Sequence, residues 1–280
     1  MSFVIRPARA EDVASIGRWT QDTFIWGDYV PEMMGGWLEE PDSLVIVCVY
    51  DDDIPVALSR AQLLSPTEAW LSAARVHPEH RRSGMGMAMN EHAVEWARSH
   101  GALVARLVIE ESNEAARGQV TRSNYRPAGR WAYATAPGST GRRLPQDERL
   151  RPGITVDADA AWTFWSQSDL AHAARDLISL GWRWRKASRN DLERAVNTHN
   201  FYQSPGGWVV AEADEEGISV RWLATTAPDA PLLLQGLRDL LRDREGGRVE
   251  AMVPVTVWSV EALLREGFEV HPAEIYSKAL

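Results

Sequence analysis

The stretch that decides the fold is Val76-His77-Pro78-Glu79-His80-Arg81-Arg82-Ser83-Gly84-Met85-Gly86-Met87-Ala88. An apolar run at 69–77 leads into it, and 84–99 continues with apolar residues on one helical face. The pattern therefore predicts a strand, a loop that carries two arginines, and a helix that begins at two glycines spaced by one residue.

This junction has the features of an anion-binding loop. The first backbone N–H groups of a helix lack intrahelical partners and point at one spot, where the helix dipole favours negative charge. Gly84 and Gly86 would let the backbone approach a diphosphate without a Cβ in the way, and Arg81 and Arg82 add positive charge. The alternative at this point is a helix cap that binds nothing.

Two other phosphate-binding motifs do not fit the same residues. A dinucleotide fingerprint needs a third glycine where Met89 stands, and the strands before it look like an antiparallel meander. A P-loop needs Gly-Lys followed by Ser or Thr, which the sequence does not contain.

The segments around the loop predict an α+β fold with a mixed, mostly antiparallel central sheet flanked by helices. Strands are expected at 3–6, 43–50, 56–64, 69–77, 103–110 and 125–135, and helices at 10–24, 84–99 and 113–123. The stretch between the first helix and residue 43 is expected to be rich in loops.

This arrangement resembles the GNAT superfamily of acyl-CoA-dependent N-acetyltransferases, over about residues 3–135. The motif that carries the resemblance best is Arg81-Arg82-Ser83-Gly84-Met85-Gly86. The resemblance implies that acetyl-CoA is the cosubstrate and that residues 81–87, from Arg81 to Met87, hold its pyrophosphate. It also implies that the backbone of Val76 pairs with the pantetheine amide, between the strands at 69–77 and 103–110.

A second part of the family pattern falls on the helix at 113–123. The family has Asn at its start, then Ala, Tyr, Gly and Phe three, seven, eleven and twelve residues on. This sequence has Asn113, Ala116, Val120, Asn124 and Tyr125 at those places. The resemblance adds Asn113 to the CoA-binding residues, but Val120 replaces the tyrosine that commonly acts as general acid. The catalytic residues therefore stay unassigned.

The second half predicts a shortened copy of the first. Ile5-Arg6-Pro7-Ala8 with Asp12 resembles Trp184-Arg185-Lys186-Ala187 with Asp191, an offset of 184 − 5 = 179. Arg122-Ser123-Asn124-Tyr125 resembles Arg265-Glu266-Gly267-Phe268, an offset of 265 − 122 = 143. An unrelated α+β domain is the alternative.

We expect an acyl-CoA-binding domain at 1–167, a connecting helix at 168–181, and a degenerate copy at 182–280. The first domain would contain a long loop at 136–153 and end in a strand at 160–167. The junction Thr225–Pro231 of the copy has no glycine pair and no arginine, and Asp229 would repel a diphosphate. We interpret the copy as non-catalytic.

Substrate residues are expected in the segment after the first helix. Trp26, Asp28, Tyr29 and Glu32 form an aromatic and acidic set that suits a cationic amine through charge pairing and cation–π contact. The alternative is that the tryptophans of this segment belong to the core.

Composition limits the partners and the compartment. The 280 residues carry a net charge of −9, which argues against a nucleic-acid partner. No apolar run is long enough for a membrane span, and the N-terminus lacks a signal-peptide core, so we expect a cytoplasmic protein that is a monomer or weak dimer. Cys48 is the single cysteine and is expected to be buried. His77 and His92 are expected to lie at the surface or in packing contacts, and we expect no metal.

The leading functional hypothesis is an N-acetyltransferase that transfers acetyl from acetyl-CoA to a primary amine of a small molecule or peptide by direct attack. One alternative is a non-catalytic acyl-CoA-binding sensor. The other is a tandem acyltransferase that resembles mycothiol synthase.

Overall fold

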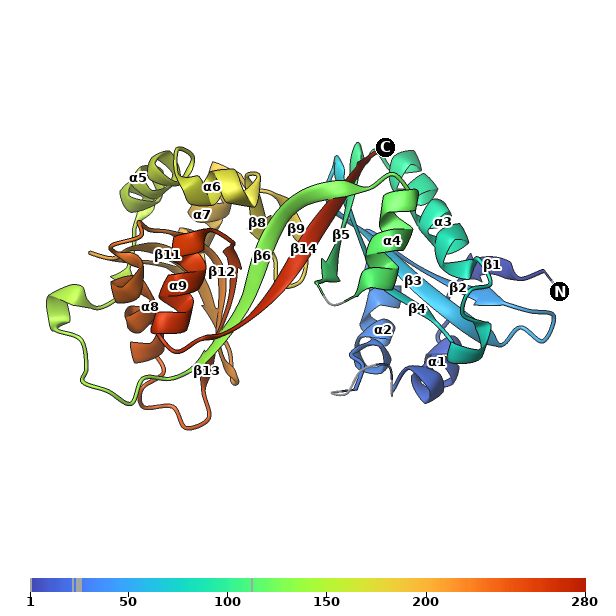
Figure 1. Ribbon diagram of the computed structural model, residues 1–280, viewed down its shortest axis with the longest axis horizontal. Helices are drawn as coiled ribbons and strands as arrows, with labels where there is room; N and C mark the ends of the chain where they lie inside the picture. Colours follow the sequence, from blue (N-terminus) through green and yellow to red (C-terminus); the bar gives the residue numbers. More distant parts are fainter. Residues whose placement is uncertain (1, 22, 24–26, 112) are drawn as a thin grey trace. The chain divides into compact units, whose positions relative to one another are not determined.

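The computed structural model describes residues 2–21, 23, 27–111 and 113–280 (Figure 1). The chain forms two compact units. Unit 1 contains Met1–Leu107, Glu114–Arg126 and Tyr276–Leu280, and unit 2 contains Val108–Asn113 and Pro127–Ile275.

Unit 1 is an α+β unit whose strands lie in the order β1-β2-β3-β4-β5. Strands β1 to β4 pair antiparallel and β4 pairs parallel with β5, which is the mixed, mostly antiparallel arrangement expected. Its elements are β1 (Val4–Pro7), α1 (Asp12–Thr20), α2 (Val30–Glu39), β2 (Ser43–Val49), β3 (Pro55–Ser65), β4 (Glu68–Val76), η1 (Pro78–His80), α3 (Met85–Ser99), β5 (Val104–Glu110) and α4 (Glu114–Arg122).

Strand β2 shows why helices cover both faces of this sheet. Successive side chains of a strand point to opposite faces. Val45, Val47 and Val49 pack in one core with α1 and α2, whereas Ile46 and Cys48 pack in a second core against α3 (Figure 1). Cys48 is fully buried, as expected, and burial raises the pKa of its thiol to about 11.

Helix α2 lies where a loop-rich stretch was expected. Val30, Met34 and Trp37 are buried, and their spacing of four and three residues places them on one helical face. Burial of this face outweighs the low helix propensity of Gly35 and Gly36 within the helix.

Unit 2 has the strand order β14-β6-β13-β12-β11-β10-β7, with a separate hairpin of β8 and β9. It repeats the plan of unit 1, because antiparallel pairs lead to the parallel pair of β12 and β13. Its elements are β6 (Arg126–Pro137), η2 (Gln146–Glu148), β7 (Arg151–Pro152), α5 (Thr155–Trp165), α6 (Asp169–Ala174), β8 (Leu177–Ser179), β9 (Trp184–Lys186), α7 (Arg189–Asn197), β10 (Phe201–Ser204), β11 (Gly207–Ala213), β12 (Gly217–Ala224), α8 (Ala230–Asp239), β13 (Arg248–Pro254), α9 (Val257–Arg265) and β14 (Glu269–Ala279).

The compact units divide the chain at other points than the expected boundaries at 167 and 182. The strand expected at 125–135 is present as β6, but it pairs with β13 from Trp131 to Pro137 and lies mainly in unit 2. The last strand begins in unit 2, while Tyr276–Leu280 belong to unit 1. There the N–H of Leu280 donates to the carbonyl of Leu103 at 3.0 Å.

The prediction of a strand at 160–167 was wrong, because α5 continues through this segment to Trp165. The aromatic residues suggested a strand, yet Ala158, Ala161 and Trp165 are buried at helical spacing. The helix expected at 168–181 is shorter than predicted: α6 ends at Ala174, and β8 follows.

The first landmark of the internal repeat is an ion pair that recurs in both units. In unit 1, Arg6 Nη1 lies 2.7 Å from Asp12 Oδ2, and Asp12 also accepts the N–H of Arg9 at 2.8 Å. In unit 2, Arg185 Nη1 lies 3.0 Å from Asp191 Oδ2, which accepts the N–H of Ser188 at 2.8 Å.

The offset of these pairs is constant, since 185 − 6, 191 − 12 and 188 − 9 all equal 179. In each unit the aspartate therefore joins the end of a strand to the first turn of the next helix.

The second landmark is a helix end with the same backbone geometry in both units. The N–H of Tyr125 donates to the carbonyl of Val120, and that of Phe268 to Leu263, both at 3.0 Å. Each bond spans a left-handed residue, Asn124 at φ 63° or Gly267 at φ 77°. The two tandem copies are thereby confirmed at both ends of the repeat.

We predict that Asp12→Asn lowers the free energy of unfolding at pH 7 by about 1.5–3 kcal/mol, the contribution of hydrogen bonds to a charged group. Burial alone would raise the pKa of Asp12, but hydrogen bonds from Arg6 and Arg9 outweigh it, so the pKa lies below its usual value. The stabilisation is therefore present above the unfolded pKa near 4 and is lost as the pH falls further. Urea denaturation of variant and wild type at pH 7 and at low pH measures this difference.

The matched control is Asp53→Asn, because Asp53 also binds Arg6 but is half exposed. Its loss should lower the free energy of unfolding by much less than the loss of Asp12, because solvent screens an exposed ion pair. Equal effects of the two variants at pH 7 would contradict the role given to Asp12.

Candidate functional site

The loop between β4 and α3 presents a row of free backbone N–H groups. Arg82 and Gly84 have left-handed backbone conformations, with φ of 63° and 87°. Within the described part of the chain, none of the N–H groups of residues 82–86 donates a hydrogen bond to a protein acceptor. Alternation of left-handed with other backbone conformations makes the N–H groups of successive residues converge into a concavity that binds anions.

Glycine is required at the two positions of this loop for different structural reasons. A Cβ on Gly84 would meet nothing within 4 Å, so the space beside it is open, but its φ of 87° disfavours any other residue. A Cβ on Gly86 would lie 3.1 Å from Nε2 of Gln119, so this glycine allows α3 to approach α4. The open space therefore lies at Gly84.

Side chains anchor this loop on one side and leave it charged on the other. Met85 is buried with Met89 in the core under α3, while Arg81, Arg82 and Ser83 are exposed. Met87 is also exposed. Neither arginine forms an ion pair with any described residue, so both positive charges are available to a ligand.

Val76 lies at the end of β4, where one edge of the strand is open. Pairing of β4 with β5 runs from Glu68↔Val104 to Trp70↔Arg106, and β4 continues to Val76. The N–H of His77 donates to Val56 at 2.8 Å on the β3 side. Because bonding alternates along an antiparallel pair, the peptide groups of Val76 point away from β3, toward the open edge.

Helix α4 carries the second part of the expected site. Asn113 directly precedes it and donates its N–H to the carbonyl of Glu110 at 2.9 Å. Val120 is buried, as is Tyr125, whose hydroxyl accepts a hydrogen bond from Asn90 at 3.2 Å. Burial raises the pKa of Tyr125 to about 12, which makes it a weak proton donor.

The substrate-side residues are only partly as expected. Trp26 lies outside the described residues. Asp28 has a fully buried side chain that accepts hydrogen bonds from Arg75 at 2.8 Å and from the N–H of Val30 at 3.1 Å. Its charge is therefore neutralised inside the protein. Tyr29 and Glu32 are exposed at the start of α2.

Arg75 and Tyr29 extend this buried contact, which sequence reasoning missed. The Arg75 guanidinium lies 5.4 Å from the ring centroid of Tyr29, and the Tyr29 ring meets Trp37 edge-on at 5.9 Å. Trp37 is buried in the core, as the alternative interpretation of this segment had it. Arg75 is 47 residues from Asp28, so no local pattern indicated the pair.

The corresponding junction of unit 2 is closed. The carbonyl of Thr226 accepts the N–H groups of Asp229 and Ala230, and Pro231 has no N–H to offer. A Cβ on Gly206 would lie 2.7 Å from the backbone nitrogen of Leu233, so the turn before β11 covers the start of α8. Protein atoms therefore fill the place that is open at Gly84.

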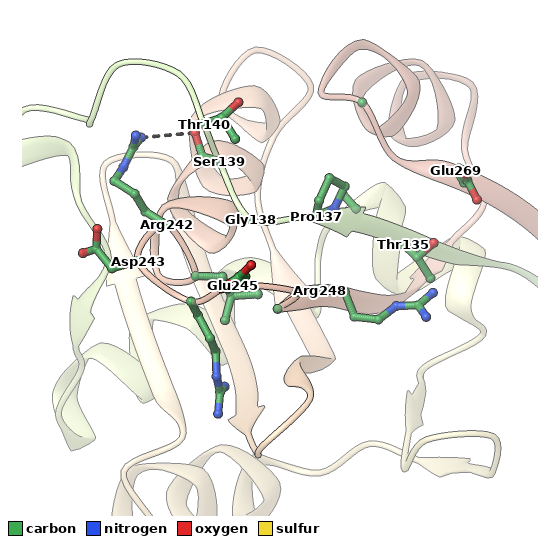
Figure 2. A pocket seen from close by; sticks show the side chains of 16 residues that line it. Thr135, Pro137, Gly138, Ser139, Thr140, Arg242, Asp243, Glu245, Arg248 and Glu269 are labelled. Atoms are coloured by element: carbon green, nitrogen blue, oxygen red, sulfur yellow. Dashed lines mark hydrogen bonds between the residues drawn. The ribbon is translucent and has the colours of Figure 1, made fainter.

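Unit 2 also has an open hollow of about 660 Å³ (Figure 2). It lies at the amino end of β13. A site like the loop at 81–87 would instead lie at the carboxyl end of a strand, where the next helix begins. Its arginines Arg242, Arg244 and Arg248 are balanced by the carboxylates of Asp243, Glu245 and Glu269. Arg242 is also bonded to Ser139 at 3.1 Å. This hollow is therefore not a counterpart of the loop at 81–87.

Among the described residues, no helix is long and apolar enough to cross a membrane.

Comparison with known proteins links this geometry to a family. Residues 13–122 match the model of the acetyltransferase (GNAT) family. A search of curated proteins found no match.

Several solved structures resemble the whole chain in fold. A GCN5-related N-acetyltransferase from Sphaerobacter thermophilus has a TM-score of 0.70 at 16% identity, over 99% of this chain and 95% of its own. A tandem GNAT protein from the clavulanic acid biosynthesis pathway has a TM-score of 0.62 at 16% identity, over 99% and 98%. A GCN5-related N-acetyltransferase from Kribbella flavida has a TM-score of 0.53 at 14% identity, over 99% and 72%. At these identities the likeness concerns the fold.

We predict that Asp28→Asn lowers the free energy of unfolding by about 3 kcal/mol, because it leaves Arg75 without the carboxylate that neutralises it in a mostly buried place. Chemical denaturation measures this loss. Glu32→Gln is the control, since an exposed residue should change stability by less than about 0.5 kcal/mol. If Asp28→Asn kept full stability and instead raised KM for cationic amines, Asp28 would be a substrate contact.

Proposed function

We propose that this chain transfers the acetyl group of acetyl-CoA to a primary amine, because residues 13–122 match the model of the acetyltransferase (GNAT) family and the whole chain shares its fold with a tandem GNAT structure. The observation that carries the proposal is the loop at 82–86, whose N–H groups bind no acceptor among the described residues and lie beside two arginines that pair with no described carboxylate. A diphosphate matches this loop in charge and in its need for several hydrogen-bond donors.

We assign the CoA side to Val76, Arg81, Arg82, Ser83, Gly84, Met85, Gly86, Met87 and Asn113. The backbone N–H groups of 82–86 would bind the diphosphate, with the Arg81 and Arg82 guanidinium groups adding charge-assisted contacts. The outward-facing peptide groups of Val76 would bind the pantetheine arm at the open edge of β4, as a short extra strand does. Met85 would contribute through its backbone alone, because its side chain is in the core.

The reaction is a direct displacement at the thioester. The neutral amine attacks the carbonyl carbon, a C–N bond forms, and the C–S bond breaks with release of the CoA sulfur as thiolate. The nitrogen loses its proton to water. A backbone N–H would stabilise the oxyanion. Acceptors of this chemistry are amines of small molecules or peptides.

The chain works, in this proposal, without a tyrosine that protonates the sulfur. Val120 occupies the expected place, and Tyr125 is buried with a pKa of about 12. A thiol has a pKa of about 8.5, so release as thiolate near pH 7.5 costs only about 1.4 kcal/mol. Loss of the acid is therefore tolerable.

Val120 also favours a second candidate function, a sensor that binds acyl-CoA without turnover. Such a protein would need the same diphosphate loop and no proton donor. Tight acetyl-CoA binding with no turnover across a panel of amines would support it.

We predict that Gly84→Ala weakens acetyl-CoA binding about 5- to 30-fold, because a left-handed conformation costs an L-residue about 1–2 kcal/mol and the loop would relax away from it. Isothermal titration calorimetry with acetyl-CoA measures the change. The matched control is Gly246→Ala, since Gly246 has a φ of 74° and open space beside it, but lies in unit 2. Equal binding by both variants would reject the loop as the site.

We also predict the pH dependence of turnover. The rate should rise with pH as the amine loses its proton and then stay level to about pH 9, because no enzyme acid has to remain protonated. Initial rates between pH 6 and 9.5 test this. Tyr29→Phe is the informative variant, because Tyr29 is an exposed tyrosine on the substrate-side segment. A falling basic limb that this variant removes would identify Tyr29 as the acid.

A further inference from the structure

The turn that precedes the loop at 81–87 contains three side chains with metal-binding atoms. His77, Glu79 and His80 each offer one such atom, and these atoms all lie within 4.8 Å of one another. His77 precedes the single turn of 3₁₀ helix at Pro78–His80. Because such a turn has three residues, side chains three apart stack on the same side, as these two histidines do. Their ring centroids are 5.5 Å apart.

We propose that His77, Glu79 and His80 bind a divalent transition-metal cation of the Zn²⁺ class. Two imidazoles and one carboxylate form a donor set suited to Zn²⁺, Co²⁺ or Ni²⁺, whereas Mg²⁺ and Ca²⁺ prefer oxygen ligands. Three protein ligands leave at least one position for water. This assignment does not depend on the acetyltransferase activity.

The backbone that carries these ligands is held at both ends. The N–H of His77 donates to Val56 at 2.8 Å, that of His80 to His77 at 2.9 Å, and that of Arg81 to Pro78 at 3.4 Å. The ring of Pro78 fixes its own φ. Only side-chain torsions therefore have to be ordered when a cation binds, which limits the entropic cost.

Aromatic neighbours restrict the two imidazole rings as well. Trp19 meets His77 edge-on at 5.6 Å, and Tyr50 lies 5.3 Å from His80. Trp19 is itself held by a hydrogen bond from its indole N–H to the carbonyl of Pro55 at 3.2 Å. Both histidines are half-buried while Glu79 is exposed, so the cluster is accessible from solvent on the carboxylate side.

Binding requires a small inward movement of these side chains. Metal–ligand bonds of about 2.0–2.2 Å place the atoms of a tetrahedron roughly 3.4 Å apart, so the most distant pair must close by at most about 1.4 Å. His77 Nδ1 accepts the N–H of Glu79 at 3.3 Å, which is long for a hydrogen bond. Its loss is therefore a minor cost if this nitrogen becomes the ligand.

The test is a titration of the full-length, untagged chain with Co²⁺ after treatment with a chelator. Co²⁺ serves as the probe because its visible absorption reports coordination by nitrogen and oxygen ligands directly. Competition with Zn²⁺ then gives the affinity for zinc. The buried Cys48 thiol does not compete for the probe.

Three variants make the test specific: Glu79→Gln, His80→Gln and, as the matched control, His92→Gln. His92 is an exposed histidine on α3 outside the cluster. Circular dichroism checks their folding, and exposure of Glu79 makes Glu79→Gln the variant that best preserves the turn.

We expect one Co²⁺ per chain, and affinity at least about 10–100-fold lower in Glu79→Gln and His80→Gln, since even second-shell changes at metal sites cost this much. His92→Gln should bind like the wild type. Absence of a cobalt spectrum in the wild-type chain would overturn the proposal. So would a spectrum that persists unchanged in both cluster variants, because another group would then hold the ion.

Discussion

The free N–H groups at the start of α3, which bind no acceptor among the described residues, are the feature on which the proposed function of unit 1 depends. A backbone N–H must find water, a protein acceptor or a ligand, and several that converge favour an anion. Two constraints keep these groups in place. Burial of Met85 and Met89 fixes the first turn of α3 on the sheet, and the left-handed conformations of Arg82 and Gly84 turn the preceding peptides toward the same space. The site is therefore a property of the backbone, with the arginines as its charged border.

The two copies show what separates an open junction from a filled one. Both keep the strand-to-helix ion pair and the left-handed helix end, at constant offsets in sequence. These features stabilise the fold and are indifferent to a ligand. At the second junction, Thr226 takes up the N–H groups and the turn at Gly206 covers the helix start. The tandem arrangement thus repeats the scaffold, and only one of the two described junctions is open.

The sequence allowed the fold of unit 1 and the loop at 81–87 to be predicted because both follow from local patterns. Alternation along β2 and the helical spacing after Gly84 depend on neighbours in the chain. The errors arose where local preference and burial disagree. A loop-rich stretch was expected at α2 and a strand at the end of α5, but in each case the buried face follows helical spacing.

Contacts between distant residues could not be predicted in the same way. Asp28 was expected to bind a cationic substrate, but it pairs with Arg75 inside the protein. The approach of Gly206 to Leu233 gives the second junction a steric closure that the repulsion expected from Asp229 alone did not reveal. The sequence shows the two histidines and the glutamate of the turn at 77–80. That their side-chain atoms converge depends on the three-dimensional fold.

The central claim is that one junction of this tandem protein binds CoA and the other does not. Native mass spectrometry of the intact chain with excess acetyl-CoA tests it most directly, because it counts bound ligands per chain. The account predicts a single bound acetyl-CoA that is lost when Gly84 is replaced by valine. Two bound acetyl-CoA molecules per chain, or one that remains in the Gly84→Val variant, would contradict it.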